Sequence, residues 1–245
     1  LTLEVYQPPA DFPQSPPRPT VVVIYGGAWQ RGTPTQDPQL SRYLAAQGYV
    51  VVAVDYRHAP QYRFPAQLED VERAIAFVCD HAAEYEVDCD RMAVLGRSAG
   101  AHLAMLAAYR SSSVPLRAVV NYYGPVDLAS AYRNPPVPDP IDTRGVLNAF
   151  LGAGPDQVPE LYRQASPLAA VQPQLPPTLM FYGGRDNVVE AKYGRELAQQ
   201  LQATGNSVVY IEIPWADHSF DAVFNGVSNQ LAVYYIERFL AHVLR

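Results

Sequence analysis

The chain has 245 residues, of which 49% are hydrophobic and 17% are charged, and its formal net charge is −6. This composition is typical of a globular protein, and the length predicts a single α/β domain over residues 1–245. The negative charge, without any lysine or arginine cluster, argues against a nucleic-acid partner, and no apolar run approaches the roughly 20 residues of a membrane span.

Short apolar runs that resemble strands alternate with segments that resemble helices. The first run, residues 1–6, alternates between apolar and polar side chains. The later runs are rich in valine, isoleucine and tyrosine, and they cover residues 20–25, 49–54, 92–95, 116–123, 178–182 and 207–213. The predicted helices cover residues 37–47, 66–84, 99–109, 190–203 and 227–243. Because near-continuous apolar strands suit a parallel sheet covered on both faces, we predict an open, mostly parallel α/β sheet.

Residues 130–167 interrupt this alternation. A proline-rich run at residues 134–140 excludes a regular helix or a central strand there. Helical pieces are expected afterwards, at residues 143–151 and 155–164. A long surface excursion is one interpretation, but long loops in compact domains are often lids, so we expect this segment to cover the active site.

The two cysteines, Cys79 and Cys89, are too few for a disulfide framework, and a zinc site requires more ligands nearby. We therefore expect two ordinary thiols, and neither a bound metal nor a cofactor. The alternative is a single disulfide between them, which requires the helix that carries Cys79 to end soon after that residue.

The most informative motif is G-x-S-x-G at residues 96–100. It follows a strand-like apolar run and precedes a segment rich in alanine, leucine and methionine, which is the context that gives this motif weight. The glycines allow a sharp turn between strand and helix, and the turn lifts the hydroxyl of Ser98 out of the sheet. We therefore predict that Ser98 is a nucleophile.

A serine hydroxyl requires a base, and the histidines differ in their suitability for that role. In an open parallel sheet the loops that follow the strands form the site, which favours His58 and His218 over the histidines inside predicted helices. His218 also comes last in the chain, as the order serine, acid, histidine requires. We predict His218 as the base and expect His102 to be a helix-packing residue.

The orienting acid is expected after a strand between the serine and the histidine. Asp186 fits, because it follows the strand-like run at residues 178–182 through a Gly-Gly turn. Asp217 and Asp221 are weaker alternatives, since a residue adjacent to the histidine usually points away from it. Asp127, which follows another strand, is the most credible spare acid.

Two segments offer backbone amides for an oxyanion. One is the amide of Ala99 at the start of the helix after the serine, where the helix dipole also favours negative charge. The other is the Gly-Gly turn at residues 26–28, which follows a strand. A nucleotide-binding interpretation of this turn is weak, because it lacks G-x-G-x-x-G and no helix follows directly.

Seven stretches together resemble the α/β-hydrolases, and among them the compact hormone-sensitive-lipase-like and feruloyl-esterase-like carboxylesterases. The stretches are residues 25–29, 55–60, 64–70, 96–100, 123–127, 183–186 and 217–218. The resemblance implies an α/β-hydrolase fold, with Ser98 as nucleophile, Asp186 as acid and His218 as base. It also implies that the amides of Gly27, Ala28 and Ala99 form the oxyanion hole.

Two positions depart from the family pattern, which has a histidine where Tyr25 stands and a third glycine where Ala28 stands. Both substitutions keep the backbone amides, but the methyl group of Ala28 narrows the expected pocket. We therefore expect a serine carboxylesterase that hydrolyses small or short-acyl esters through an acyl-enzyme. The expected pocket walls are aromatic: Trp29, Tyr132, Phe150 and Phe220.

Other functions remain open at this stage. They are a feruloyl or acetyl esterase of plant polymers, a serine peptidase or acyltransferase of the same fold, and a silent binding protein. The complete set of serine, acid and histidine argues against the silent binding protein, and no additional peptide-gripping domain is evident.

Overall fold

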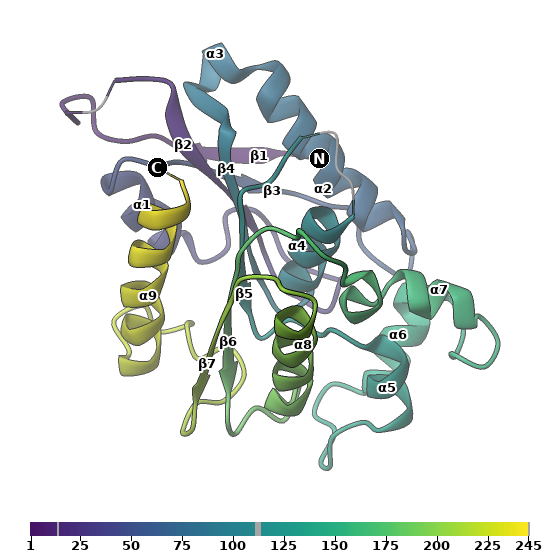
Figure 1. Cartoon of the computed structure of the whole chain (residues 1–245). Helices are drawn as coiled ribbons and strands as arrows, with labels where there is room; N and C mark the ends of the chain where they lie inside the picture. Colours follow the sequence, from purple (N-terminus) through teal and green to yellow (C-terminus); the bar gives the residue numbers. More distant parts are fainter. Residues whose placement is uncertain (14, 111–113, 245) are drawn as a thin grey trace.

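The computed structural model describes residues 1–13, 15–110 and 114–244. Within these residues, seven strands form one sheet in the order β1-β3-β2-β4-β5-β6-β7 (Figure 1). The strands are β1 (Leu3–Tyr6), β2 (Arg18–Ile24), β3 (Val50–Val54), β4 (Val87–Arg97), β5 (Ala118–Tyr122), β6 (Thr178–Gly183) and β7 (Val208–Ile213). Only β1 pairs antiparallel, with β3, and the other described pairs are parallel, which confirms the mostly parallel sheet.

Helices cover both faces of the sheet (Figure 1). α1 (Pro38–Ala46) and α9 (Val227–Val243) lie on one face, where the hydroxyl of Tyr43 donates a hydrogen bond to Glu237. α2 (Ala66–Asp80), α4 (Ala99–Tyr109) and α8 (Ala191–Ala203) lie on the other face. Strands β2, β3, β5 and β6 are buried along their whole length, because helices exclude water from both of their faces. α4 is apolar on nearly every side and is almost wholly buried, as expected of a central helix.

The excursion between β5 and β6 contains short helices. They are α5 (Leu128–Arg133), α6 (Thr143–Leu151), α7 (Pro159–Gln164) and the 3₁₀ helix η1 (Pro167–Ala170). The helical piece expected at residues 143–151 has the predicted bounds, whereas α7 begins four residues later than the piece predicted at residues 155–164. α5 was not predicted; Asp127 caps it by accepting a hydrogen bond from the amide of Ser130. These helices lie on the α4 and α8 side of the sheet (Figure 1), and we refer to residues 128–170 as the cap segment.

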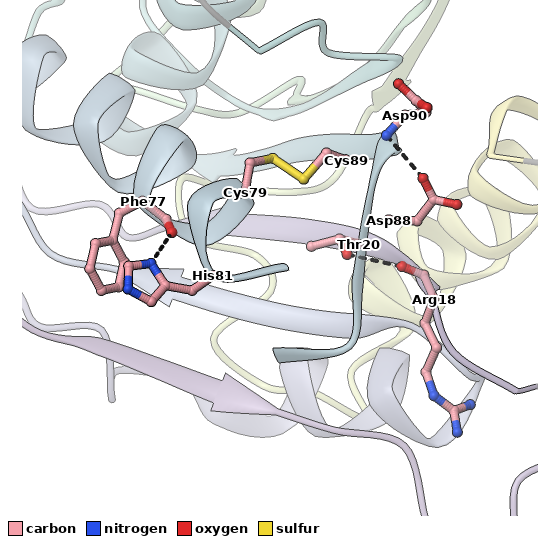
Figure 2. The surroundings of a disulfide bond; sticks show 8 residues. All are labelled: Arg18, Thr20, Phe77, Cys79, His81, Asp88, Cys89 and Asp90. Carbon is pink, nitrogen blue, oxygen red and sulfur yellow. Dashed lines mark hydrogen bonds between the residues drawn. A yellow bond between two sulfur atoms is a disulfide. The ribbon is translucent and has the colours of Figure 1, made fainter. Parts of the chain in front are cut away.

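The prediction of two ordinary thiols is wrong, because Cys79 and Cys89 form a disulfide (Figure 2). The helix predicted over residues 66–84 ends earlier: α2 ends at Asp80, and a separate short helix, α3 (Ala82–Tyr85), follows. The chain can therefore turn back into β4 and bring Cys89 to a Cα–Cα distance of 5.8 Å from Cys79, within the usual disulfide range.

Removing this disulfide should lower the free energy of unfolding by about 2–3 kcal/mol, because the bond closes a short loop and restricts the unfolded chain. The two cysteines are 10 residues apart in the sequence. Urea unfolding with and without reductant measures the change in the free energy of unfolding of the parent. The Cys79→Ser/Cys89→Ser variant is the control, because its stability should not depend on the reductant. Identical midpoints for parent and double variant would contradict the prediction.

Candidate active site

Ser98 occupies a strained turn between the end of β4 and the start of α4. Its backbone has φ 51° and ψ −119°, a conformation that persists only where the surroundings fix it. A β-carbon added to Gly96 would lie 2.3 Å from the carbonyl oxygen of Gly100, and one added to Gly100 would lie 2.2 Å from that of Ile24. Both glycines are therefore required for the helix to start this close to the sheet.

His218 connects Ser98 with Asp186. Its Nε2 lies 3.1 Å from the Oγ of Ser98, and its Nδ1 lies 2.8 Å from Oδ2 of Asp186. The carboxylate only accepts hydrogen bonds, so Nδ1 carries the proton and Nε2 is free to accept the proton of Ser98. Ser98, His218 and Asp186 follow β4, β7 and β6 respectively, and they meet at the same edge of the sheet, where the parallel strands end.

Asp186 is fixed by its own neighbours. The side chain is buried, and its Oδ1 accepts hydrogen bonds from the backbone amides of Val188 and Val189 at 2.8 and 2.9 Å. The remaining oxygen, Oδ2, is thereby aimed at His218. The loops are also joined directly, because the amide of Arg185 donates to the carbonyl oxygen of Ala216 at 3.0 Å.

The turn after β2 lies directly against Ser98. A β-carbon on Gly26 would come within 2.9 Å of the carbonyl oxygen of Arg97. Gly27, Ala28 and Trp29 all have positive φ, at 133°, 54° and 59°. Within the described part of the chain, the amides of Gly27, Ala28 and Ala99 donate to no acceptor, and all three residues line the same cavity as Ser98. The three amides are therefore available to a bound group.

Tyr25, which stands at the start of this turn, is held by polar contacts with the loop after β3. Its hydroxyl donates to Oδ1 of Asp55 at 2.6 Å and lies 2.9 Å from Nε2 of His58. Its ring stacks on Tyr56 with a centroid distance of 4.4 Å. Burial, with the hydrogen bond to Asp55, raises the pKa of Tyr25 far above its ordinary value. His58, the alternative base, therefore contacts Tyr25 and not Ser98.

A buried ion pair that no sequence pattern predicted adjoins His218. Arg97 donates from Nε to Oδ2 of Asp221, whose Oδ1 accepts the hydroxyl of Tyr123. The ring of Tyr123 packs against the imidazole of His218, with centroids 4.5 Å apart. Burial opposes the charge of Arg97, but Asp221, Tyr123 and Tyr122 together outweigh that effect, and the pKa of Arg97 rises. The pair joins the residue before Ser98 to the loop that carries His218.

The three alternatives to Asp186 as the orienting acid do not contact His218 in this role. Asp221 is committed to Arg97 and Tyr123, Asp127 caps α5, and Asp217 is exposed. Asp186 is the carboxylate that contacts His218.

Above Ser98 lies a cavity of about 290 Å³, lined mainly by apolar side chains. The cap segment contributes Leu128 and a further set of lining residues: Ala131, Ile141, Thr143, Val146 and Leu147. Of the four aromatic residues predicted as pocket walls, Trp29 lines the cavity and three do not. Tyr132 packs against Tyr162, Phe150 is buried behind Trp29, and Phe220 packs on Tyr122 and Tyr123. The cap side of the cavity is aliphatic because α5 and α6 turn apolar side chains into it.

His102, expected to be a packing residue, is fully buried on α4 and also makes hydrogen bonds. Burial lowers its pKa from 6.5 to about 4, with a further decrease from Arg110 and a partial increase from the bond to the Ala165 carbonyl. The imidazole is therefore neutral near pH 7.

This burial predicts a pH dependence of stability. Between pH 6.5 and about 4 the unfolded chain binds a proton at residue 102 that the folded chain does not, so the contribution of His102 is complete above pH 6.5 and is lost as the pH falls towards 4. The free energy of unfolding in urea should therefore fall more steeply between pH 7 and 5 in the parent than in His102→Asn. Equal slopes would contradict this prediction.

The described residues contain no cluster of three or more histidine, cysteine or acidic side chains that could hold a metal ion. In the same residues, every helix is too short or too polar to cross a membrane.

Comparisons with known proteins show the family of the chain. Residues 3–201 match the BD-FAE family. The chain is 32% identical to the probable carboxylic ester hydrolase LipM of Mycobacterium tuberculosis, over 98% of this chain and 58% of the relative. It is 33% identical to the esterase LipC of the same organism, over 96% of this chain and 60% of the relative. The chain therefore spans about 60% of the length of these curated relatives.

Solved structures of esterases have the same fold as this chain. The structure of Thermogutta terrifontis esterase 2 phosphonylated by sarin has a TM-score of 0.84 and 27% identity, and the match covers 98% of this chain and 89% of that one. The propionate-bound form of the Thermogutta terrifontis esterase has a TM-score of 0.80 and 26% identity, with the same coverage.

Proposed function

Because the chain belongs to the BD-FAE family and has the α/β-hydrolase fold, we propose that it is a serine carboxylesterase that hydrolyses small or short-acyl esters. The observation that carries the proposal is the continuous hydrogen-bond chain from Ser98 through His218 to Asp186. This hydrogen-bond chain lies at the base of an apolar cavity, beside backbone amides that have no acceptor among the described residues. This is the arrangement that activates a hydroxyl for acyl transfer.

The first half of the reaction forms an acyl-enzyme. Nε2 of His218 accepts the proton of Ser98 while Oγ attacks the ester carbonyl carbon. The negative charge that develops on the carbonyl oxygen is stabilised by the amides of Gly27, Ala28 and Ala99, and one such donor typically contributes about 3 kcal/mol. His218 then gives its proton to the leaving alcohol.

The second half releases the acid. His218 accepts a proton from water as the water oxygen attacks the acyl carbon, and a second oxyanion forms at the same amides. The intermediate collapses, and the proton returns to Ser98. Asp186 holds the imidazole in the tautomer that both halves require and stabilises the imidazolium that forms in each.

The size of the cavity and its cover support the preference for short acyl chains. A volume of about 290 Å³ is at the small end of ligand pockets. The cap segment forms part of its wall, so we propose that this segment acts as a lid that admits small esters and excludes long ones.

A series of p-nitrophenyl esters from acetate to palmitate tests the proposal. We expect kcat/KM to be highest for the short chains and turnover to vanish in Ser98→Ala. Ser41→Ala removes a serine hydroxyl from α1, outside the cavity, and should retain the parent rate. Hydrolysis by Ser98→Ala at the parent rate would exclude Ser98 as nucleophile, and a preference for palmitate would exclude the small pocket.

A further inference from the structure

Trp29 links the turn after β2 to two other parts of the molecule. Its indole stacks on Phe150 of the cap segment, with centroids 4.2 Å apart and rings 9° from parallel. Its Nε1 lies 3.2 Å from Nδ1 of His102 on α4. Both contacts are buried. The residue that ends the run of positive φ values is therefore held from two sides.

The contacts of His102 fix its tautomer. An indole N–H only donates, so Nδ1 of His102 must be the acceptor and Nε2 must carry the proton. Nε2 lies 2.6 Å from the carbonyl oxygen of Ala165, which accepts that proton. Burial also lowers the pKa of His102 to about 4, so the neutral ring that this pattern requires is the form present near pH 7.

His102 thus contacts three segments, two of them through its ring and one through its backbone. Its own backbone amide donates to the carbonyl oxygen of Ser98 at 3.0 Å, its Nδ1 holds Trp29, and its Nε2 holds Ala165 of the cap segment. The conformations of Gly27, Ala28 and Trp29 are unfavourable for L side chains and persist only where contacts determine them. The bond from Trp29 to His102 is such a contact, and it lies on the helix that follows the nucleophile.

We propose that His102 is a positioning residue for ester hydrolysis: its neutral imidazole holds Trp29, and through Trp29 it holds the amides of Gly27 and Ala28 where the oxyanion forms. This inference rests on the proposed function. It predicts that loss of the Trp29–His102 bond weakens the binding of the oxyanion and leaves the binding of the uncharged ester nearly unchanged.

Trp29→Phe tests the inference with little change of shape, since it keeps an aromatic ring beside Phe150 and removes only the indole donor. The matched control is Trp215→Phe. The indole of Trp215 also donates to a side chain, Oγ of Ser228 at 3.1 Å, but it is 54% exposed and does not line the cavity. The two variants make the same substitution and lose the same kind of hydrogen bond.

Two quantities separate positioning from general structure. One is the division between kcat and KM for p-nitrophenyl acetate. The other is the inhibition constant of a short alkyl trifluoromethyl ketone. Oγ of Ser98 adds to the ketone carbon, the serine proton passes to His218, and the negative charge on the hemiketal oxygen requires the same amides.

We expect Trp29→Phe to lower kcat about tenfold, less than the 10²–10³-fold loss typical of deleting a direct donor. The ketone should bind more weakly by a similar factor, with KM within about twofold of the parent. Trp215→Phe should match the parent in kcat, in KM and in the inhibition constant of the ketone. His102→Asn, which keeps an acceptor near the position of Nδ1, should retain more kcat than His102→Leu.

Three other outcomes would contradict the positioning role of His102 or the proposed function. If Trp29→Phe matches Trp215→Phe in kcat and in ketone binding, His102 has no positioning role, while the proposed function still stands on Ser98→Ala. If His102→Asn and His102→Leu lose kcat equally and have the same midpoints of urea unfolding, the acceptor at Nδ1 does not position Trp29, and the inference is wrong. Turnover that survives in Ser98→Ala would instead overturn the proposed function itself.

Discussion

Asp186→Asn should fold as the parent does and lose about four orders of magnitude in kcat, the loss typical of this substitution in a serine–histidine–aspartate system. The local contacts explain why. The amides of Val188 and Val189 both donate to one oxygen of residue 186, so the oxygen of the new side-chain amide will remain with them. Its NH₂ group then faces Nδ1 of His218 and makes that nitrogen an acceptor. Nε2 carries the proton and cannot accept the one from Ser98.

Steady-state kinetics with p-nitrophenyl acetate measures this loss, and circular dichroism checks the fold. Asp127→Asn is the matched control, since Asp127 caps α5 and asparagine caps helices about equally well; it should retain the parent kcat. A fall of less than tenfold in Asp186→Asn would contradict the role of Asp186.

Arg97→Met should have the largest effect on stability, lowering the free energy of unfolding by about 3–5 kcal/mol, the usual cost of breaking a buried ion pair. The substitution leaves the carboxylate of Asp221 buried with the Tyr123 hydroxyl and without a cation. Arg97→Met/Asp221→Asn removes that charge and keeps an acceptor for Tyr123, so it should recover much of the loss.

Urea unfolding of the parent, Arg97→Met, Asp221→Asn and the double variant forms a double-mutant cycle. The cycle gives the coupling free energy between the two residues. A cost below about 1 kcal/mol for Arg97→Met, with no recovery in the double variant, would show that the pair contributes little to stability. Because the pair ties the residue before Ser98 to the loop of His218, we expect kcat to recover together with stability in the double variant.

The sequence allowed the sheet to be predicted because most of its strands, β2, β3, β5 and β6, are buried along their whole length and form continuous apolar runs in the sequence. The same pattern located the ends of β4, β6 and β7, where Ser98, Asp186 and His218 follow. Parallel strands end at one edge, so residues far apart in the chain were expected to meet there, and the structure brings these three side chains together. The helix boundaries were predicted less accurately, because the helix expected over residues 66–84 is divided into α2 and α3.

Features that depend on one particular pairing of distant segments were not predictable. Arg97 and Asp221 are 124 residues apart, and nothing in either local sequence indicates the other. Tyr132 and Phe150 were expected in the pocket for their aromatic character alone, but periodicity does not say which side of a cap helix faces the serine. The disulfide depended on the end of a single helix at Asp80. The mostly parallel sheet follows from general rules, whereas these contacts follow from the details of packing.

Covalent labelling of Ser98 tests the central claim most directly. A p-nitrophenyl alkylphosphonate should release about one equivalent of p-nitrophenol per chain as Oγ of Ser98 displaces it, and mass spectrometry should find the phosphonyl group on the peptide that contains Ser98. Ser98→Ala should release none, and His218→Ala should react far more slowly, because Oγ then has no base. An adduct on another residue, or full ester hydrolysis by a chain whose Ser98 is phosphonylated, would contradict the mechanism.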